Sequence, residues 1–276
     1  MVKYFMLQIL QNDYIFLLGT GLLGLIVGSF LNVIIYRLPI MLLRESTTPV
    51  LNLITPRSHC PKCGSFIPWQ QNIPIISYIL LKGKCNSCQT IINWHYPTVE
   101  LLSCLTALLV AAYFGISIKT LAILILTWAL IAAIFIDFAY QLLPDNITLP
   151  LIWLGLLLNT LNIFTTPTNA IIGAASGYLA LWLIAHIFKS IRKIDGMGYG
   201  DFKLLAVFGA WLGWQLLPII LFGASLIGSA VGLVLICRKK AQFAQPMPFG
   251  PYLAFTGWLA FFVETNILYW YFSIPN

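Results

Sequence analysis

The chain has 276 residues, of which 60% are hydrophobic and only 8% are charged. Its mean hydropathy is +0.90. Soluble globular domains carry roughly half apolar and about a quarter charged residues, so this composition excludes an ordinary soluble domain. The net charge of +7 does not indicate nucleic-acid binding, because the basic residues are spread over the segments between apolar runs. We expect an all-α polytopic membrane protein, surrounded by the lipid bilayer and without a nucleic-acid partner.

Apolar runs close to the length of a membrane span, about 20 residues, recur along the chain. The first run, Tyr14 to Tyr36, is too long for the apolar core of a signal peptide and has no Ala-x-Ala-like site after it. We therefore expect it to remain as the first helix. We predict about eight transmembrane helices, at 14–36, 97–115, 120–137, 147–164, 169–188, 202–214, 216–237 and 249–272.

Residues 37–96 form the one sizeable polar segment, and its six prolines disfavour a long helix. Domains this small commonly need a staple such as a metal ion. We predict a small cytoplasmic domain here. It divides the chain into an N-terminal segment with the first helix (1–36), the cytoplasmic domain (37–96) and a membrane-embedded domain (97–276).

Four of the six cysteines lie in this polar segment as two Cys-x-x-Cys pairs, Cys60 with Cys63 and Cys85 with Cys88. Two such pairs supply the four thiolates that hold Zn²⁺ tetrahedrally in structural sites. Because four sulfur ligands leave no open position, we predict one structural zinc per chain in a zinc-ribbon-like insertion. The alternative is a pair of disulfides, which a reducing cytoplasm disfavours.

Two aspartates lie at the ends of apolar runs: Asp137 closes one, and Asp201 opens another directly after Gly198 and Gly200. An ionisable residue in a membrane segment is costly and often marks function. The glycines permit a close approach of another backbone or a substrate strand. A helix cap or an interfacial position is the simpler explanation for either aspartate alone. We favour a catalytic pair, and we expect Asp145 to be an N-cap.

Two other polar positions lie near helix ends. Asn32, beside Gly28 and Ser29, can hydrogen-bond across helices, and both plain packing and a role in a site are open for this stretch. Glu100 lies at the start of the second predicted helix, where it can interact with the helix dipole.

The basic residues also set an orientation. With the N-terminus outside, 13 of the 15 Lys and Arg residues fall in the cytoplasm, and only Lys3 and Lys119 fall outside. This orientation places Asp137 and Asp201 on the same cytoplasmic side, although neither residue was used to choose it.

Together these stretches resemble the type IV prepilin leader peptidases with N-methyltransferase activity, bacterial members of the GxGD membrane aspartyl proteases. The resemblance covers nearly the whole chain. It is carried by Gly28 to Val33 with Arg37-Leu38-Pro39, both Cys-x-x-Cys pairs, Tyr96-Pro97 with Val99-Glu100, Asp137 through Asp145, and Gly198 to Asp201.

The resemblance implies a multi-pass enzyme of the bacterial inner membrane with Asp137 and Asp201 as its catalytic pair. Such an enzyme cleaves the leader of type IV prepilins or type II secretion pseudopilins at the cytoplasmic face. It then methylates the new N-terminus with S-adenosylmethionine. Gly83 matches a glycine tied to methylation in the family, and family members usually carry Arg where this chain has His95.

Peptide hydrolysis by two carboxylates needs one to activate water and the other to protonate the leaving amine. Which aspartate takes which role is open, because a coupled pair titrates as a unit. A proton-coupled transporter is the alternative, although the chain shows no internal halves and proton relay leaves the cysteines unexplained. A methyltransferase alone is a third reading. No Gly-rich nucleotide fingerprint locates the methyl donor.

Overall fold

The computed structural model is built almost wholly from helices, and its described residues contain no strand beyond two isolated bridges. The predicted all-α fold class is therefore confirmed. The described residues are 14–43, 52–193, 197–238 and 247–272, with side chains described as far as Val263. Four basic residues counted in the orientation argument lie outside them: Lys3, Arg44, Lys239 and Lys240.

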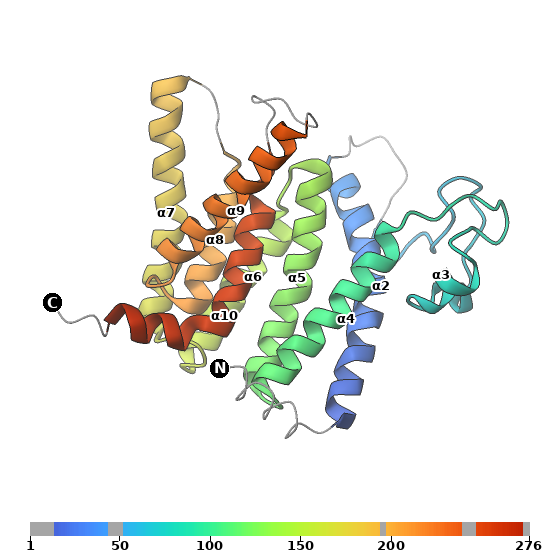
Figure 1. Ribbon diagram of the computed structural model, residues 1–276, viewed down its shortest axis with the longest axis horizontal. Helices are drawn as coiled ribbons and strands as arrows, with labels where there is room; N and C mark the ends of the chain where they lie inside the picture. Colours follow the sequence, from blue (N-terminus) through green and yellow to red (C-terminus); the bar gives the residue numbers. More distant parts are fainter. Residues whose placement is uncertain (1–13, 44–51, 194–196, 239–246, 273–276) are drawn as a thin grey trace. The chain divides into compact units, whose positions relative to one another are not determined.

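Within the described residues, eight long helices lie where eight apolar runs were predicted (Figure 1). They are α2 (Tyr14–Leu43), α4 (His95–Phe114), α5 (Ile118–Tyr140), α6 (Asp145–Thr160), α7 (Pro167–Arg192), α8 (Tyr199–Leu212), α9 (Leu217–Cys237) and α10 (Gly250–Phe272). The polar segment adds a 3-10 turn, η1 (Trp69–Asn72), and the short helix α3 (Ile76–Leu80).

Among the described residues, five helices are long and apolar enough to cross a membrane: α2, α4, α5, α7 and α9. Of the other three, α6 and α8 have 16 and 14 residues, and α10 forms a shorter apolar stretch over Gly250–Val263. The 14 residues of α8 extend roughly 21 Å at about 1.5 Å per residue, less than the hydrocarbon thickness of a bilayer.

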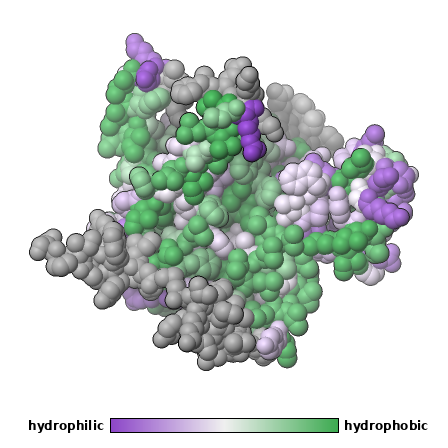
Figure 2. All heavy atoms as spheres, in the orientation of Figure 1, coloured by the Kyte–Doolittle hydropathy of each residue, from purple (hydrophilic) through white to green (hydrophobic). Residues whose placement is uncertain are grey.

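The outer surfaces of the helices are apolar. Figure 2 shows hydrophobic residues over much of the helical part, whereas many hydrophilic residues gather on the polar segment around α3. Large exposed side chains include Leu18 and Leu22 on α2 and Leu226 and Leu233 on α9. So much exposed apolar surface is compatible with lipid but not with water. The protein is a multi-pass membrane protein.

The chain divides into two compact units, residues 1–132 and 133–276. In the first, α2 packs along α4 with almost no space between the backbones. A Cβ atom on Gly24 would lie 2.8 Å from the Cα of Cys104, and one on Gly28 would lie 2.7 Å from the Cα of Glu100. Both distances are too short for a carbon atom, so the glycines permit this close crossing.

The helix α2 continues past its predicted end at Tyr36 and includes Pro39 near its C-terminus. The physical reason is a set of contacts made by the buried Arg37 guanidinium. It donates hydrogen bonds to the backbone oxygens of Asn52 at 2.9 Å and Pro56 at 2.7 Å. These bonds connect the beginning of the described polar segment to the last turns of α2. Pro39 removes only one helical hydrogen bond, so the helix can continue past it.

In the second unit, α8 is the central helix and contacts α6, α7, α9 and α10. Its backbone touches that of α7, because a Cβ on Gly173 or on Gly209 would collide with the backbone of the other. Asn159 of α6 donates to the carbonyl of Ala210 at 2.8 Å, and Trp211 donates back to α6. This packing fixes the C-terminal half of α8 against α6 and α7.

Candidate active site and metal-binding cluster

The two aspartates predicted to form a pair meet inside the second unit. Asp137 lies in the last turn of α5 and is 5% exposed; Asp201 lies in the first turn of α8 and is 8% exposed. Their carboxylates are close enough to interact electrostatically. Among the described residues, neither Oδ2 of Asp137 nor Oδ1 of Asp201 has a hydrogen-bond partner. Buried polar atoms without a partner are rare, and they call for a functional explanation.

Helix α8 begins three residues earlier than predicted, so Asp201 lies within its first turn. The free N–H groups of a helix N-terminus favour a negative charge at this place. Gly198 is the N-cap residue, and a Cβ there would be in ordinary contact with Asp201 Oδ2 at 3.9 Å. The close approach expected for both glycines is therefore required only at Gly200.

A Cβ on Gly200 would lie 2.5 Å from the Cβ of Leu143, which follows α5 in the chain. Leu143 also meets Gly250, the first residue of α10, and a Cβ there would lie 2.6 Å from Asp137 Oδ2. The Gly250 backbone is a hydrogen-bond partner of Asp137. Sequence reasoning missed Gly250. The sequence feature that could have indicated Gly250 is the Pro-Phe-Gly-Pro stretch at 248–251, which begins the last apolar run.

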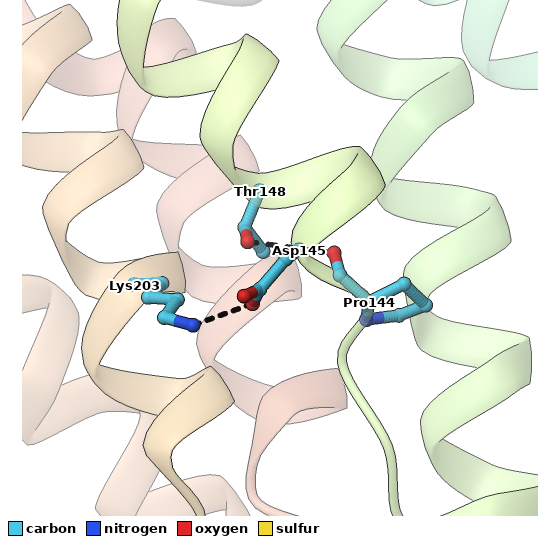
Figure 3. A network of polar contacts seen from close by, with 4 residues as sticks. All are labelled: Pro144, Asp145, Thr148 and Lys203. Carbon is cyan, nitrogen blue, oxygen red and sulfur yellow. Dashed lines mark hydrogen bonds and ion pairs between the residues drawn. The ribbon is translucent and has the colours of Figure 1, made fainter. Parts of the chain in front are cut away.

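Asp145 is not the N-cap that the sequence suggested. Pro144 occupies that position without a side-chain capping bond, and Asp145 is the first residue of α6. Its Oδ1 pairs with Nζ of Lys203 on α8 at 2.5 Å, while Thr148 Oγ1 donates to the Pro144 carbonyl at 3.4 Å (Figure 3). The carboxylate stabilises a contact between two helices instead of capping one.

This ion pair is partly open to solvent, with side-chain exposures of 23% for Lys203 and 52% for Asp145. Because solvent screens such pairs, we expect Asp145→Asn, Lys203→Met and the double variant to give a coupling energy of about 1 kcal/mol or less. Thermal unfolding of all four proteins in one detergent measures it. A coupling above about 2 kcal/mol would show that the pair behaves as a buried one.

The four cysteines of the polar segment gather at one point, and their Sγ atoms all lie within 4.8 Å of one another. Four sulfurs around Zn²⁺ at about 2.3 Å are roughly 3.8 Å apart, so the cluster fits a tetrahedral metal ion. Each Cys-x-x-Cys pair forms the same turn. The N–H of Cys60 donates to the Ser65 carbonyl at 2.9 Å, and that of Cys85 donates to the Thr90 carbonyl at 2.8 Å.

The surroundings of the second pair favour thiolates, the form of cysteine that binds metals. Hydrogen bonds from the side chain and then the backbone of Thr90 lower the pKa of Cys88 to about 6. Backbone hydrogen bonds from Cys88 and Ser87 also lower the pKa of Cys85.

Gly83 and Glu100 also lie in the first unit. Gly83 has φ +67°, and a Cβ there would be strained and would lie 3.1 Å from the Tyr78 ring. Its carbonyl accepts from the N–H of Ile92 at 2.7 Å, which connects α3 to the second cysteine turn. Glu100 is buried and accepts a hydrogen bond from the N–H of Ile75 at 2.8 Å. It therefore binds the polar segment and is more than a helix-dipole partner.

Known proteins match the chain over nearly all of its length. A protein of Aeromonas salmonicida is 48% identical over 268 residues, which cover 91% of this chain and 92% of that protein. The chain belongs to the type IV leader peptidase family. Residues 124–233 match the family described by that name, and residues 22–114 match the bacterial peptidase A24 N-terminal domain.

The Aeromonas salmonicida protein is named prepilin leader peptidase/N-methyltransferase. Two other family members carry the same name. The one from Pseudomonas aeruginosa is 46% identical over 260 residues, or 89% of each chain. The one from Legionella pneumophila is 41% identical over 277 residues, or 95% of this chain and 96% of its own. No solved structure matches. The resemblance drawn from the sequence is confirmed, and the transporter alternative is not favoured.

Proposed function

We propose that this protein is a prepilin leader peptidase and N-methyltransferase of the bacterial inner membrane. It cleaves the leader of type IV prepilins or type II secretion pseudopilins and then methylates the new N-terminus. The observation that carries the proposal is the buried meeting of Asp137 and Asp201 in a chain of this family. The N-terminus lies outside, and cleavage takes place at the cytoplasmic side.

The pair acts in cleavage as acid and base. Two adjacent carboxylates cannot both be ionised easily, so they share one proton. The ionised carboxylate takes a proton from water while the water oxygen attacks the peptide carbonyl carbon. The protonated carboxylic acid then gives its proton to the amine as the C–N bond breaks. The Oδ atoms of Asp137 and Asp201 that have no partner among the described residues are the ones we assign to these two proton transfers.

Methylation follows on the amine that cleavage frees. S-adenosylmethionine, when bound, supplies a methyl group on a positively charged sulfur. The amine would accept this methyl group and release a proton, and the sulfur would keep the electrons of the broken C–S bond. We assign this step to the cytoplasmic domain, residues 37–96, with the helix ends that border it, and cleavage to the Asp137 and Asp201 pair within the membrane-embedded residues 97–276. The four-cysteine cluster holds one structural Zn²⁺ in that domain.

The test is incubation of the purified protein with a prepilin in the absence of S-adenosylmethionine. Leader loss on a gel, with the expected new N-terminus by sequencing, supports the proposal. A prepilin that stays intact with a folded, membrane-reconstituted enzyme argues against it. Proton flux into liposomes carrying the protein would then favour the transporter.

The assignment of methylation and cleavage to different parts of the chain gives a specific prediction at Gly83. Gly83→Ser places a Cβ at φ +67° and against the Tyr78 ring, so we expect it to lower methylation at least about tenfold and cleavage less than about threefold. Gly64→Ser is the matched control. It has the same strain, at φ +70°, but no atom within 4 Å of the added Cβ. Equal loss of both activities in a folded Gly83→Ser protein would reject the division.

A further inference from the structure

The first unit contains a cavity of about 450 Å³. This volume is within the range of sites for small organic molecules, about 300–1,000 Å³. Its walls come from α2, from the cysteine-containing segment and from the start of α4. Among the side chains that line it are Asn32, Tyr36, Tyr78, Ile92, Tyr96 and Glu100.

One buried polar atom in this wall has no partner. Asn32 is 7% exposed, and its Nδ2 donates to the Tyr96 carbonyl at 3.1 Å. Its Oδ1 accepts no hydrogen bond from any described residue. A buried acceptor left unpaired is destabilising, so this oxygen is expected to receive a donor from a ligand.

A buried carboxylate faces the same cavity. Glu100 accepts from the N–H of Ile75 and has Ser29 as a second hydrogen-bond partner. Across the described part of the chain, no Lys, Arg or His forms an ion pair with it. The nearby Arg37 donates instead to backbone carbonyls of the polar segment. Buried carboxylates usually have a cationic partner, so the cavity is suited to a ligand that carries positive charge.

Much of the remaining wall is aromatic and apolar, although the cations Arg37 and Lys62 also line it. Three tyrosines, Tyr36, Tyr78 and Tyr96, line the cavity together with aliphatic residues such as Ile92. Aromatic faces attract both flat heterocycles and organic cations. The site therefore combines a negative charge, a free acceptor and aromatic surface within a volume suited to a nucleoside.

We propose that this cavity binds S-adenosylmethionine, with Glu100 as the partner of its positive charge and Asn32 Oδ1 as the acceptor for one of its N–H groups. A sulfonium-bearing nucleoside is the ligand that uses all three features. The inference rests on the proposed function, which requires a methyl donor but does not locate it.

Direct binding tests the site without relying on catalysis. The two probes are S-adenosylmethionine and S-adenosylhomocysteine, which lacks the methyl group and the sulfonium charge. Each is titrated into the zinc-loaded full chain in nanodiscs, and its binding is measured by calorimetry. Glu100→Gln is expected to weaken S-adenosylmethionine about tenfold or more, and S-adenosylhomocysteine less than about threefold. Asn32→Leu is expected to weaken both about fivefold. Asp145→Asn removes a carboxylate outside the cavity and should change neither.

A third variant helps to exclude misfolding as the cause of weakened binding. Val33→Phe fills the cavity from α2 without altering a polar group, and it should abolish binding of both ligands. Zinc content and the thermal midpoint are measured for each variant. For Glu100→Gln, retained binding of S-adenosylhomocysteine is itself evidence of an intact fold.

The outcomes separate this inference from the proposed function. If the wild type methylates prepilin but all three cavity variants bind S-adenosylmethionine normally, the donor site lies elsewhere and only this inference fails. If Glu100→Gln weakened the binding of both ligands equally, the inference would also be overturned, because Glu100 would then not interact with the sulfonium charge. A wild type that cleaves prepilin but neither binds the donor nor methylates would overturn both methylation and the site.

Discussion

Asp137→Asn and Asp201→Asn are each expected to lower leader cleavage by about 10³-fold or more, and the double variant is expected to be no slower than either. Asn preserves the shape and polarity of Asp but cannot exchange the proton. Because the two carboxylates serve one reaction, losing the second costs nothing further. Cleavage of a purified prepilin by the reconstituted variants measures this effect.

Asp145→Asn is the matched control for this experiment. It removes a carboxylate from the same unit, but one that is half-exposed and paired with Lys203. Cleavage should stay within about fivefold of the wild type, since a screened ion pair contributes about 1 kcal/mol or less. Each variant must also insert normally into the membrane. Substantial cleavage by either Asp137→Asn or Asp201→Asn would reject the acid–base pair.

The second large effect is expected at the cysteine cluster. Cys60→Ser and Cys85→Ser should each reduce bound zinc from one per chain to nearly none, because three thiolates no longer close the tetrahedral site. Structural zinc sites often supply the free energy of folding of small domains. Loss of the metal should therefore make residues 52–94 sensitive to proteases. Elemental analysis and limited proteolysis give the two measurements.

Cys237→Ser is the control for the cluster, because this exposed cysteine lies at the end of α9 and outside the metal site. It should retain one zinc per chain. A wild type purified without chelators that contains no zinc, or whose four cysteines are oxidised in the cell, would contradict the assignment.

Sequence reasoning succeeded where the signal was local or set by the membrane. The spacing of the two Cys-x-x-Cys pairs predicted that four sulfurs would gather, and they do. The meeting of Asp137 and Asp201 followed from placing both at helix ends on one side of the membrane, where packing of α8 brings them together. The first inference needed only the spacing of the cysteines, and the second needed only hydropathy and the distribution of charge.

Sequence reasoning failed where distant residues decide the outcome. The extension of α2 depends on Arg37 reaching carbonyls 15 to 19 residues along the chain. The role of Asp145 depends on Lys203, which is 58 residues away. The contact of Gly250 with Asp137 depends on how α10 packs in the second unit. Such partners are fixed by tertiary packing, which overrides the local preference that suggested an N-cap.

The most direct test of the central claim is a time course of intact mass for a prepilin incubated with the purified protein and S-adenosylmethionine. The account predicts that the leaderless pilin appears first and then gains one methyl group at its N-terminus. Asp137→Asn should leave the prepilin both uncut and unmethylated. Methylation of uncut prepilin, or leader loss that persists in Asp137→Asn, would contradict an aspartate pair whose cleavage supplies the amine for methylation.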